Sequence, residues 1–328
     1  MKQTLDFIKV SASIKSELKL IEQSLEENYQ SNVGLIPKVS EYLIGGGGKR
    51  IRPILLIFAA KLAGYSGERI IPLSCAIEYI HAATLLHDDV LDGAETRRKK
   101  PSANREFGNR EAILVGDFLF SKAFELIAND GDVRITQAVA TATNELAEGE
   151  IQELSLTGNL DLSEEVYMEM IYRKTGSLIC AACKIAGYLA NLPEEDIEQL
   201  HSFGKNIGIT FQLADDILDY TADQAEMGKP VGNDLREKKI TLPIIYLLQE
   251  CSTEERVVIE EIIAKEEIKD EDLAKMNFLL ERHNIFELCR NRANELKADA
   301  LNAFSHFKDK PCYRELLNVA EFILQRTF

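Results

Sequence analysis

Two short clusters of aspartates have a spacing that suits metal binding. Asp88, Asp89 and Asp92 lie in LLHDDVLD, and Asp215, Asp216 and Asp219 lie in QLADDILD. In a helix, residues four apart share a face, so the first and last carboxylates of each cluster project side by side and repel one another. A hard divalent cation would offset that repulsion, because Mg²⁺ prefers carboxylate oxygens and leaves the rest of its shell to water and substrate phosphates. The spacing therefore predicts a divalent-metal site.

A solvated acidic helix end is the alternative interpretation of such a cluster. The frame L-x-D-D-[VI]-L-D occurs twice, each time at the end of an apolar helical pattern, which favours metal binding over simple solvation. Neither copy contains the D-x-D-x-D-G loop or the glutamate at the twelfth position that an EF-hand requires. Because the flanking residues do not match over a repeat-length period, the two copies do not indicate a solenoid.

Basic residues occur near both clusters in the sequence. GGGGKRIRP is a glycine run that ends in Lys49, Arg50 and Arg52. Accessible glycine N–H groups and arginine forks suit phosphate, although the run is not a Walker A loop and a flexible turn before a helix would look the same. Further cations are Arg97, Arg98, Lys174, Lys229 and Lys239. Together with the acidic clusters, these cations predict a site for two phosphorylated groups, one bridged by metal and one held by cations alone.

The elements that must position these residues are helices. Between residues 70 and 92, Ile77, Ile80 and Thr84 recur at spacings of three and four, as on one face of a helix. Similar patterns predict helices over 4–30, 34–44, 51–64, 70–92, 111–129, 132–157, 163–190, 194–220, 241–249, 253–265, 270–283 and 285–305. No segment shows sustained strand alternation. We therefore predict an all-α protein.

Length and composition bear on domain organisation and exclude some function classes. The chain has 328 residues, 45% of them hydrophobic, and 8 scattered prolines without a linker, which favours a single domain over residues 1–328. The net charge of −16 would repel nucleic acid, so we expect no such partner. The first twenty residues lack the apolar core of a signal peptide, and no apolar run reaches the about 20 residues of a membrane span. We expect a cytoplasmic protein without a transmembrane segment.

Taken together, these motifs resemble those of the trans-polyprenyl diphosphate synthases. The resemblance runs from Gly45 to Pro243, in the right order, through GGKRIRP, the first DDxxD followed by RR, GDFLFSKAF, EGEIQEL, KTGSL, FQLA with the second DDxxD, and GKPVGNDL with the later TLP. It implies the isoprenoid synthase fold, an all-α bundle of roughly 10–13 helices around a central cavity, and a Mg²⁺-dependent prenyltransferase. Such an enzyme condenses isopentenyl diphosphate with an allylic diphosphate, farnesyl or a similar primer, to give an all-trans polyprenyl diphosphate.

The resemblance also implies a role for each matched residue. Two or three Mg²⁺ ions should be held against the allylic diphosphate by Asp88, Asp89, Asp92, Asp215, Asp216 and Asp219. The same diphosphate should be bound by Arg97, Lys174 and Lys229, with Lys239 nearby. Isopentenyl diphosphate should be bound without metal by Lys49, Arg52, His81 and Arg98. Thr175 should help to position the reacting carbons, and Gln212, one turn before the second cluster, should line the same face.

The implied reaction is ionisation, condensation and elimination. Metal and cations stabilise the charge on the departing diphosphate and leave an allylic carbocation. The double bond of isopentenyl diphosphate attacks this cation, and a proton is then lost to the released diphosphate. No protein nucleophile is needed, and no Ser–His–Asp or Cys–His arrangement is evident in the sequence.

Three positions depart from the common pattern of the family. Lys99 in RRKKP replaces a glycine, Gly93 stands where an acid is common, and REKK, with Lys238, replaces the commoner REGK. None of these departures removes a matched ligand. We expect their effects on the conformations of the local loops.

Small residues before the first cluster favour a long product. Ala83 and Thr84 lie about one turn, or ~5.4 Å, before Asp88, where bulky aromatic residues are thought to close the product tunnel of short-chain members. IEYIHAATLLHDDV looks closest to the octaprenyl-type synthases, which serve quinone side chains. We therefore predict an octaprenyl product, with a farnesyl or geranylgeranyl diphosphate synthase as the alternative.

Three other functions and two kinds of partner remain to be considered. A class I terpene cyclase usually has an N-x-x-x-S-x-x-x-E second motif, a regulatory subunit typically loses an aspartate cluster, and a generic metal protein would not need the phosphate-binding motifs. The complete second DDxxD and GGKRIRP argue against all three. The resemblance implies a homodimer, for which the apolar helix over 111–129 is a candidate interface, and release of a lipid product implies transient membrane contact.

Overall fold

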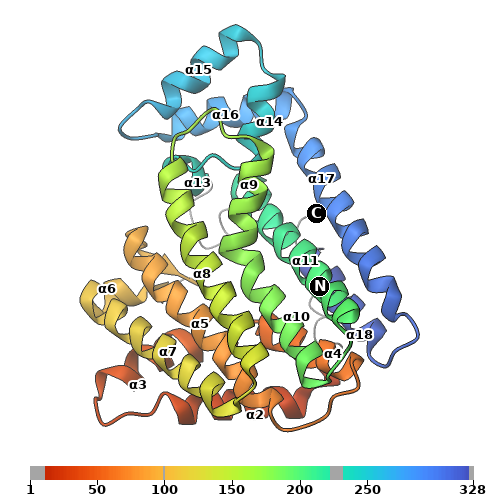
Figure 1. Ribbon diagram of the computed structural model, residues 1–328. Coiled ribbons are helices and arrows are strands. Elements are labelled where there is room, and N and C mark those ends of the chain that lie inside the picture. The colour runs from red at the N-terminus through yellow and green to blue at the C-terminus, as the bar shows by residue number, and fades with distance from the viewer. Residues whose placement is uncertain (1–11, 99, 222–231, 325–328) are drawn as a thin grey trace. The chain divides into compact units, whose positions relative to one another are not determined.

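The computed structural model describes residues 12–98, 100–221 and 232–324, with side chains to residue 322 (Figure 1). Most of these residues are helical, and the strands among them are the antiparallel pair Thr96–Arg97 (β1) and Lys100–Pro101 (β2). The predicted all-α class is confirmed. The chain divides into unit 1, residues 1–143, 178–201 and 304–322, and unit 2, residues 144–177, 202–303 and 323–328. Each unit is described by itself.

Unit 1 contains the long helix α5, Ile70–Leu91, at its core. The other elements are α2 Lys15–Asn28, α3 Leu35–Ser40, the π-helical turn η1 Glu41–Gly45, α4 Ile51–Leu62, α6 Ala103–Phe107, α7 Asn109–Asp130, the first part of α8 Val133–Leu156, most of α10 Ser177–Leu189, the start of α11 Glu194–Thr221, η3 Ser305–Phe307 and α18 Tyr313–Leu324. Helix α5 packs most extensively against α7, and also against α4 and α2 (Figure 1).

Burial explains the apolar composition of α5. Leu73, Ile77 and Ile80 are fully buried, and the hydroxyl of Tyr79 donates a hydrogen bond of 2.6 Å to the carbonyl of Leu25 in α2. Among the helices that the structure describes, α5 is the one long and apolar enough to cross a membrane, but 72% of its apolar stretch is buried within the protein. That burial is typical of a core helix.

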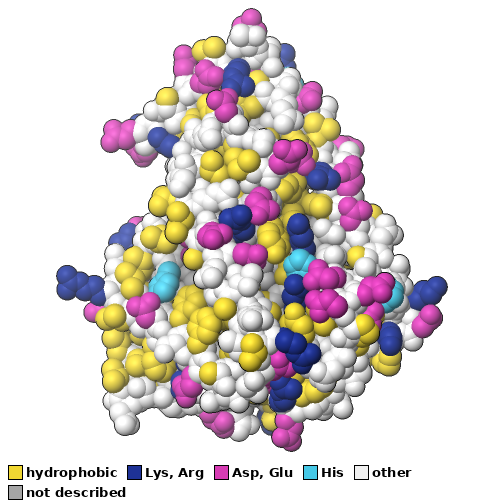
Figure 2. Space-filling model, in the orientation of Figure 1, with side chains coloured by type: hydrophobic (Ala, Val, Ile, Leu, Met, Phe, Trp, Pro, Cys, Tyr) yellow, Lys and Arg dark blue, Asp and Glu magenta, His cyan; other side chains and the backbone are white. Residues whose placement is uncertain are grey.

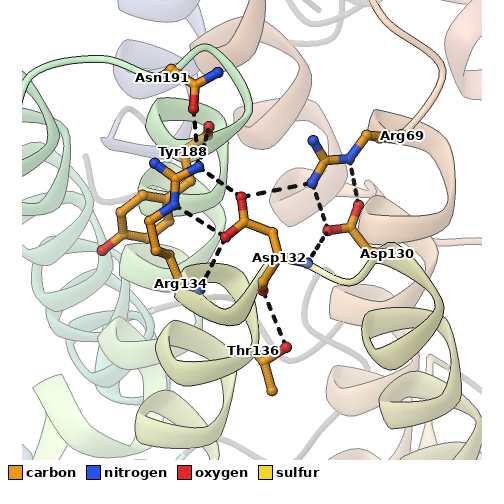
Figure 3. Close-up of polar contacts among 7 residues, drawn as sticks. All are labelled: Arg69, Asp130, Asp132, Arg134, Thr136, Tyr188 and Asn191. Atoms are coloured by element: carbon orange, nitrogen blue, oxygen red, sulfur yellow. Dashed lines mark hydrogen bonds and ion pairs between the residues drawn. The ribbon is translucent and has the colours of Figure 1, made fainter.

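An ion-pair network ties three connections of unit 1 together (Figure 3). Arg69, before α5, donates to both carboxylate oxygens of Asp130 at 2.7 Å. Asp132 accepts the backbone N–H of Arg134 at 3.0 Å, which caps the start of α8, and also binds the Arg134 guanidinium. That guanidinium reaches the side-chain oxygen of Asn191 at 3.0 Å. The network joins the ends of α7 and α8 to the connection between α10 and α11.

Unit 2 contains the remaining helices. These are the rest of α8, α9 Glu164–Ile171, the π-helical turn η2 Tyr172–Gly176, the main part of α11, α13 Asn233–Arg236, α14 Leu242–Glu250, α15 Thr253–Ile263, α16 Asp270–Arg282 and α17 Ile285–Phe304. Its core is apolar and includes Leu213 and Ile217 of α11, Leu242 and Ile245 of α14, and Met276 of α16. The buried stripe of α11 places the aspartates of the second cluster at the border of this core.

Most predicted helices agree with the structure to within a few residues. The pattern over 270–283 corresponds to Asp270–Arg282, and the pattern over 285–305 corresponds to Ile285–Phe304. The predicted helix over 163–190 is interrupted by η2, and helices α6, α13 and α18 were not predicted. Helices α6 and α13 have only five and four residues, too few for a periodic pattern to form.

Candidate active site

The first aspartate cluster closes helix α5. Asp89 is 1% exposed, and its two carboxylate oxygens each accept the Nε–H of Arg97 at 2.9 Å, with Arg97 Nη2 at 2.7 Å from Oδ1. Asp88 is half-buried, and Asp92, at the C-cap, is exposed. Carboxylates at a helix C-terminus interact unfavourably with the helix dipole, and nearby cations offset this effect. Arg97 is one such cation, and the structure brings it together with Asp89 as a bidentate pair.

The chain turns sharply after α5 to bring Arg97 back. Gly93 has φ +60°, a left-handed conformation that glycine adopts at little cost. This conformation accounts for the glycine at a position where an acid is common in the family. Strands β1 and β2 then form a short hairpin, in which Arg97 pairs with Lys100 and Arg98 has φ +53°. Lys99 lies outside the described residues.

Unit 1 gathers three of the predicted phosphate-binding residues, Arg52, Arg97 and Arg98, around His81. The imidazole of His81 is half-buried, and desolvation, reinforced by Arg52, Arg97 and Arg98, lowers its pKa well below the ordinary value. Burial also lowers the pKa of Arg52, and its buried Nε has no hydrogen-bond partner among the described residues. A neutral imidazole donor among guanidinium groups is suited to an anionic ligand. Lys49 is exposed, with its ammonium 5.2 Å from the ring centroid of Phe322.

Arg50, a possible phosphate ligand on sequence grounds, is instead a buried structural residue. Its guanidinium binds Glu22 at 2.6 Å and Glu78 at 2.9 Å, and donates to the carbonyl of Ile44 at 2.7 Å. A side chain at Gly48 would meet Arg50 Nη1 at 2.8 Å. The glycine run therefore makes room for this guanidinium. Nothing in the local sequence distinguishes Arg50 from its basic neighbours, because its glutamate partners are 28 residues away.

The second aspartate cluster lies on α11 in unit 2. Asp216 is buried and accepts hydrogen bonds from the hydroxyl of Tyr167 and from Gln212 Nε2, the latter at 2.8 Å. Burial raises the pKa of Asp216 to about 7, although both hydrogen bonds lower it. Asp219 accepts the backbone N–H of Asp234 at 3.1 Å, and Asp215 is half-buried.

The π-helical turn η2 presents Thr175 to α11. Thr175 Oγ1 donates to Gln212 Oε1 at 2.8 Å, and Gln212 in turn donates to Asp216. Thr175, Gln212, Asp216 and Tyr167 thus form one chain of hydrogen bonds. Of these, Tyr167 was not predicted, and its sequence gives no signal beyond its place on the buried face of α9.

Two predicted lysines of unit 2 meet at a pair of glutamates. Lys174 Nζ donates to Glu150 at 3.1 Å and to Glu153 at 2.6 Å. Lys239 Nζ lies 3.6 Å from the same oxygen of Glu153 and 2.6 Å from Glu237. The motif EGEIQEL contains both α8 glutamates, three residues apart, but the sequence alone did not assign them a role. Lys229 lies outside the described residues.

The carboxylates fit a hard divalent cation, although they do not form a complete site. Among the described residues, no group of three or more His, Cys, Asp or Glu side chains is arranged to hold a metal ion. Mg²⁺ in phosphate-binding enzymes usually takes one or two carboxylates and completes its octahedron with water and phosphate oxygens. The Asp88 and Asp92 pair, one helical turn apart, has that donor chemistry, and so does the Asp215 and Asp219 pair.

The positions expected to limit product length are small and lie within α5. Ala83 is fully buried, and Thr84 is half-buried with its hydroxyl bound to the carbonyl of His81 at 2.9 Å. Neither position carries an aromatic ring.

Comparison with known proteins agrees with the chemistry of these residues. The polyprenyl synthetase family model matches residues 33–279. The chain is 36% identical to the octaprenyl diphosphate synthase of Escherichia coli (strain K12), over 97% of this chain and 98% of that protein. Relatives of 31–37% identity also include nonaprenyl, heptaprenyl and geranylgeranyl diphosphate synthases.

Solved structures give the same result. A decaprenyl diphosphate synthase from Rhodobacter capsulatus superposes with a TM-score of 0.93 at 34% identity, covering 98% of this chain and 99% of that one. A polyprenyl synthase from Caulobacter crescentus, complexed with calcium and isoprenyl diphosphate, gives 0.92 at 33% identity, covering 98% of both chains. The chain therefore belongs to the polyprenyl synthetase family and is a prenyltransferase of the polyprenyl diphosphate synthase type.

Proposed function

We propose that the protein extends farnesyl diphosphate, or a similar allylic primer, with isopentenyl diphosphate to a long all-trans product, octaprenyl diphosphate, for quinone side chains. One observation carries the choice of a long product. Ala83 and Thr84, the two small residues about one turn before Asp88, place no ring where the chain must grow. The similarity to octaprenyl diphosphate synthases over nearly the full length supports the same choice.

In this proposal the two aspartate clusters hold the allylic diphosphate through two or three Mg²⁺ ions. The ligands are Asp88, Asp89, Asp92, Asp215, Asp216 and Asp219, and the cations Arg97, Lys174, Lys229 and Lys239 bind the same diphosphate. When bound, Mg²⁺ neutralises the charge that develops on the departing diphosphate. The bidentate bond from Arg97 orients Asp89, and Tyr167 and Gln212 orient Asp216.

Isopentenyl diphosphate binds without metal in unit 1. Arg52 and Arg98 supply guanidinium forks, Lys49 supplies an ammonium group, and His81 donates from a neutral ring. The buried Nε of Arg52 supports this assignment, because a buried donor that has no partner among the described residues is available to an anion.

Thr175 positions the reacting carbons while the released diphosphate accepts the proton. Its hydroxyl is held by Gln212, so its methyl group and backbone have a defined place beside the second cluster. No side chain need act as the base, because the leaving group itself carries basic oxygens close to the new bond. The steps are ionisation of the primer, attack by the double bond, and loss of the proton.

Incubation with isopentenyl diphosphate, farnesyl diphosphate and Mg²⁺, followed by chain-length analysis, tests this function. We expect octaprenyl diphosphate as the longest main product and no product after chelation. A short-chain synthase is the second candidate, because two relatives of 35–36% identity are short-chain isoprenyl diphosphate synthases. Geranylgeranyl diphosphate as the only product would support this candidate.

Replacement of Ala83 by phenylalanine tests the product tunnel directly. A ring at this position, about one turn before the first cluster, should block growth of the chain and shorten the main product by several C5 units. Thr84→Ser, which keeps a small side chain at the next position, is the matched control. An unchanged product from Ala83→Phe would contradict the tunnel model.

We also propose a cytoplasmic homodimer that touches the membrane only to release its product. Support comes from α7, where Ile113 and Leu114 are 40% and 65% exposed, and hydrophobic side chains gather over this helix at the lower left of Figure 2. A partner of another kind would make the chain a subunit, as the name of one relative, heptaprenyl diphosphate synthase component 2, suggests. Sedimentation of the purified protein separates a homodimer from a monomer that needs such a partner.

A further inference from the structure

Glu150 and Glu153 of α8 form an acidic pair that no step of the proposed reaction uses. They are three residues apart on one face of the helix and only 24% and 17% exposed. Between them they bind the ammonium group of Lys174, and Glu153 also lies 3.6 Å from that of Lys239. One carboxylate therefore lies between two cations that would otherwise repel each other.

The backbone around Lys174 is fixed by close packing on both sides. A side chain at Gly149 of α8 would meet the backbone nitrogen of Lys174 at 2.6 Å, so α8 touches the π-helical turn directly. On the other side, a side chain at Gly208 of α11 would meet Gly176 Cα at 2.5 Å. With its backbone held between two helices, Lys174 can change the place of its ammonium group only through its side-chain torsions.

The two glutamates restrict those torsions. A lysine ammonium has three N–H donors, and two of them are directed to Glu150 and Glu153, which leaves one direction for a further oxygen. Burial disfavours the charge on Lys174 and Lys239 opposes it as well, but the two glutamates outweigh both and raise the pKa of the ammonium group. The two carboxylates therefore keep the Lys174 side chain protonated and restrict the position of its ammonium group.

We propose that Glu153, assisted by Glu150, is a positioning residue for the diphosphate-binding lysines Lys174 and Lys239. Glu153 does not touch the substrate. It holds the two ammonium groups close together before the substrate binds. The diphosphate can then bind both groups without the cost of bringing two like charges together. The inference rests on the proposed function, in which both lysines bind the allylic diphosphate.

Glu153→Gln tests the proposal, because it keeps the size of the side chain and removes its charge. We expect the KM for the allylic diphosphate to rise by about tenfold to a hundredfold, the range for a lost hydrogen bond to a charged group, while the KM for isopentenyl diphosphate changes by less than about twofold. A merely structural ion pair would alter both KM values, or neither, along with the melting temperature.

Glu148→Gln is the matched control, because it makes the same change of charge on the same helix. Glu148 is 61% exposed and pairs with Arg173, the neighbour of Lys174, at 2.7 Å. We expect its KM values to equal those of the unaltered protein. Equal effects of Glu148→Gln and Glu153→Gln would overturn the proposal, since the result would then reflect net charge alone.

Lys174→Met separates failure of this inference from failure of the proposed function. A raised KM for the allylic diphosphate in Lys174→Met, with no change in Glu153→Gln, would overturn the positioning role and leave the proposed function intact. An unchanged KM in Lys174→Met would overturn the binding role of Lys174 and the inference with it. A raised allylic KM in both variants supports the inference.

Discussion

The two aspartate clusters share one frame of sequence but differ in what binds their central carboxylate. In the first cluster Asp89 is paired with the guanidinium of Arg97, whereas in the second Asp216 is bonded to the neutral donors Tyr167 and Gln212. Both carboxylates are almost completely buried. The repeated motif therefore determines which face of the helix carries acids, while residues outside the shared frame determine whether the buried acid has a counter-charge.

Removal of the first carboxylate of either cluster should have the largest effect on catalysis. Asp88→Ala and Asp215→Ala should each lower kcat by about 10²–10³-fold, the cost of losing one element of charge stabilisation at the leaving group. Steady-state assays at saturating Mg²⁺ measure this, with unchanged melting temperatures as the control for folding. If one variant kept full activity, only the other cluster would serve the reaction.

Removal of the counter-charge should destabilise the first cluster more than the second. Arg97→Met leaves the buried carboxylate of Asp89 without its cation, so we expect a loss of about 3–5 kcal/mol in the free energy of unfolding. Tyr167→Phe removes one hydrogen bond from Asp216 and should cost about 1–2 kcal/mol. Urea unfolding with chelator measures both, and equal losses would contradict the distinction drawn between a charged and a neutral partner.

The second cluster should give the metal-free protein a characteristic dependence on pH. The pKa of Asp216 is raised to about 7 from an ordinary 3.8, so between these values the folded protein binds the proton that the unfolded chain has lost. Stability should then fall by about 2–4 kcal/mol as the pH rises from about 4 to about 7. Urea unfolding at several pH values shows this slope, which should become smaller in Asp216→Asn. Asp234, whose pKa is also raised by burial, should account for the part that remains. A slope of unchanged size in that variant would assign it to Asp234 alone.

The loops that follow the two clusters should show the smallest effects, with opposite signs. Lys238, at a position that is commonly glycine in the family, has φ +58°, while Gly93 after the first cluster has φ +60°. We expect Lys238→Gly to stabilise the protein by up to about 1 kcal/mol and Gly93→Ala to destabilise it by about the same amount. Thermal unfolding measures both changes, and a destabilised Lys238→Gly would indicate that the lysine side chain contributes more than its backbone costs.

The sequence predicts helices well where a periodic face meets the core. Helix α5 was expected over 70–92 and runs over Ile70–Leu91, because its apolar residues recur at helical spacing. The interruption at η2 could not be foreseen, since it lies where Gly149 and Gly208 allow two other helices to approach its backbone. These contacts join positions some distance apart in the chain and leave no local signal.

The charged residues of the candidate site could also be predicted from the sequence. The residues that hold their side chains in place could not. Aspartates, lysines and arginines stand in recognisable motifs, whereas Tyr167 and Glu78 do not. Their importance depends on a single partner each, Asp216 and Arg50. A tyrosine or a buried glutamate on a helix has many ordinary uses, so only the folded arrangement distinguishes these two.

The π-helical turn Tyr172–Gly176 has a consequence for how this chain can change in length. A π-helical turn holds about one residue more than an α-helical turn, and each residue of an α-helix rotates the chain by about 100°. Deletion of one residue here would allow a continuous helix from α9 to α10, with no loss of helical content. It would nevertheless rotate α9 against α10 and carry Tyr167 away from Asp216. The turn thus sets the register of Tyr167 against the second cluster, and its length cannot change without breaking that hydrogen bond.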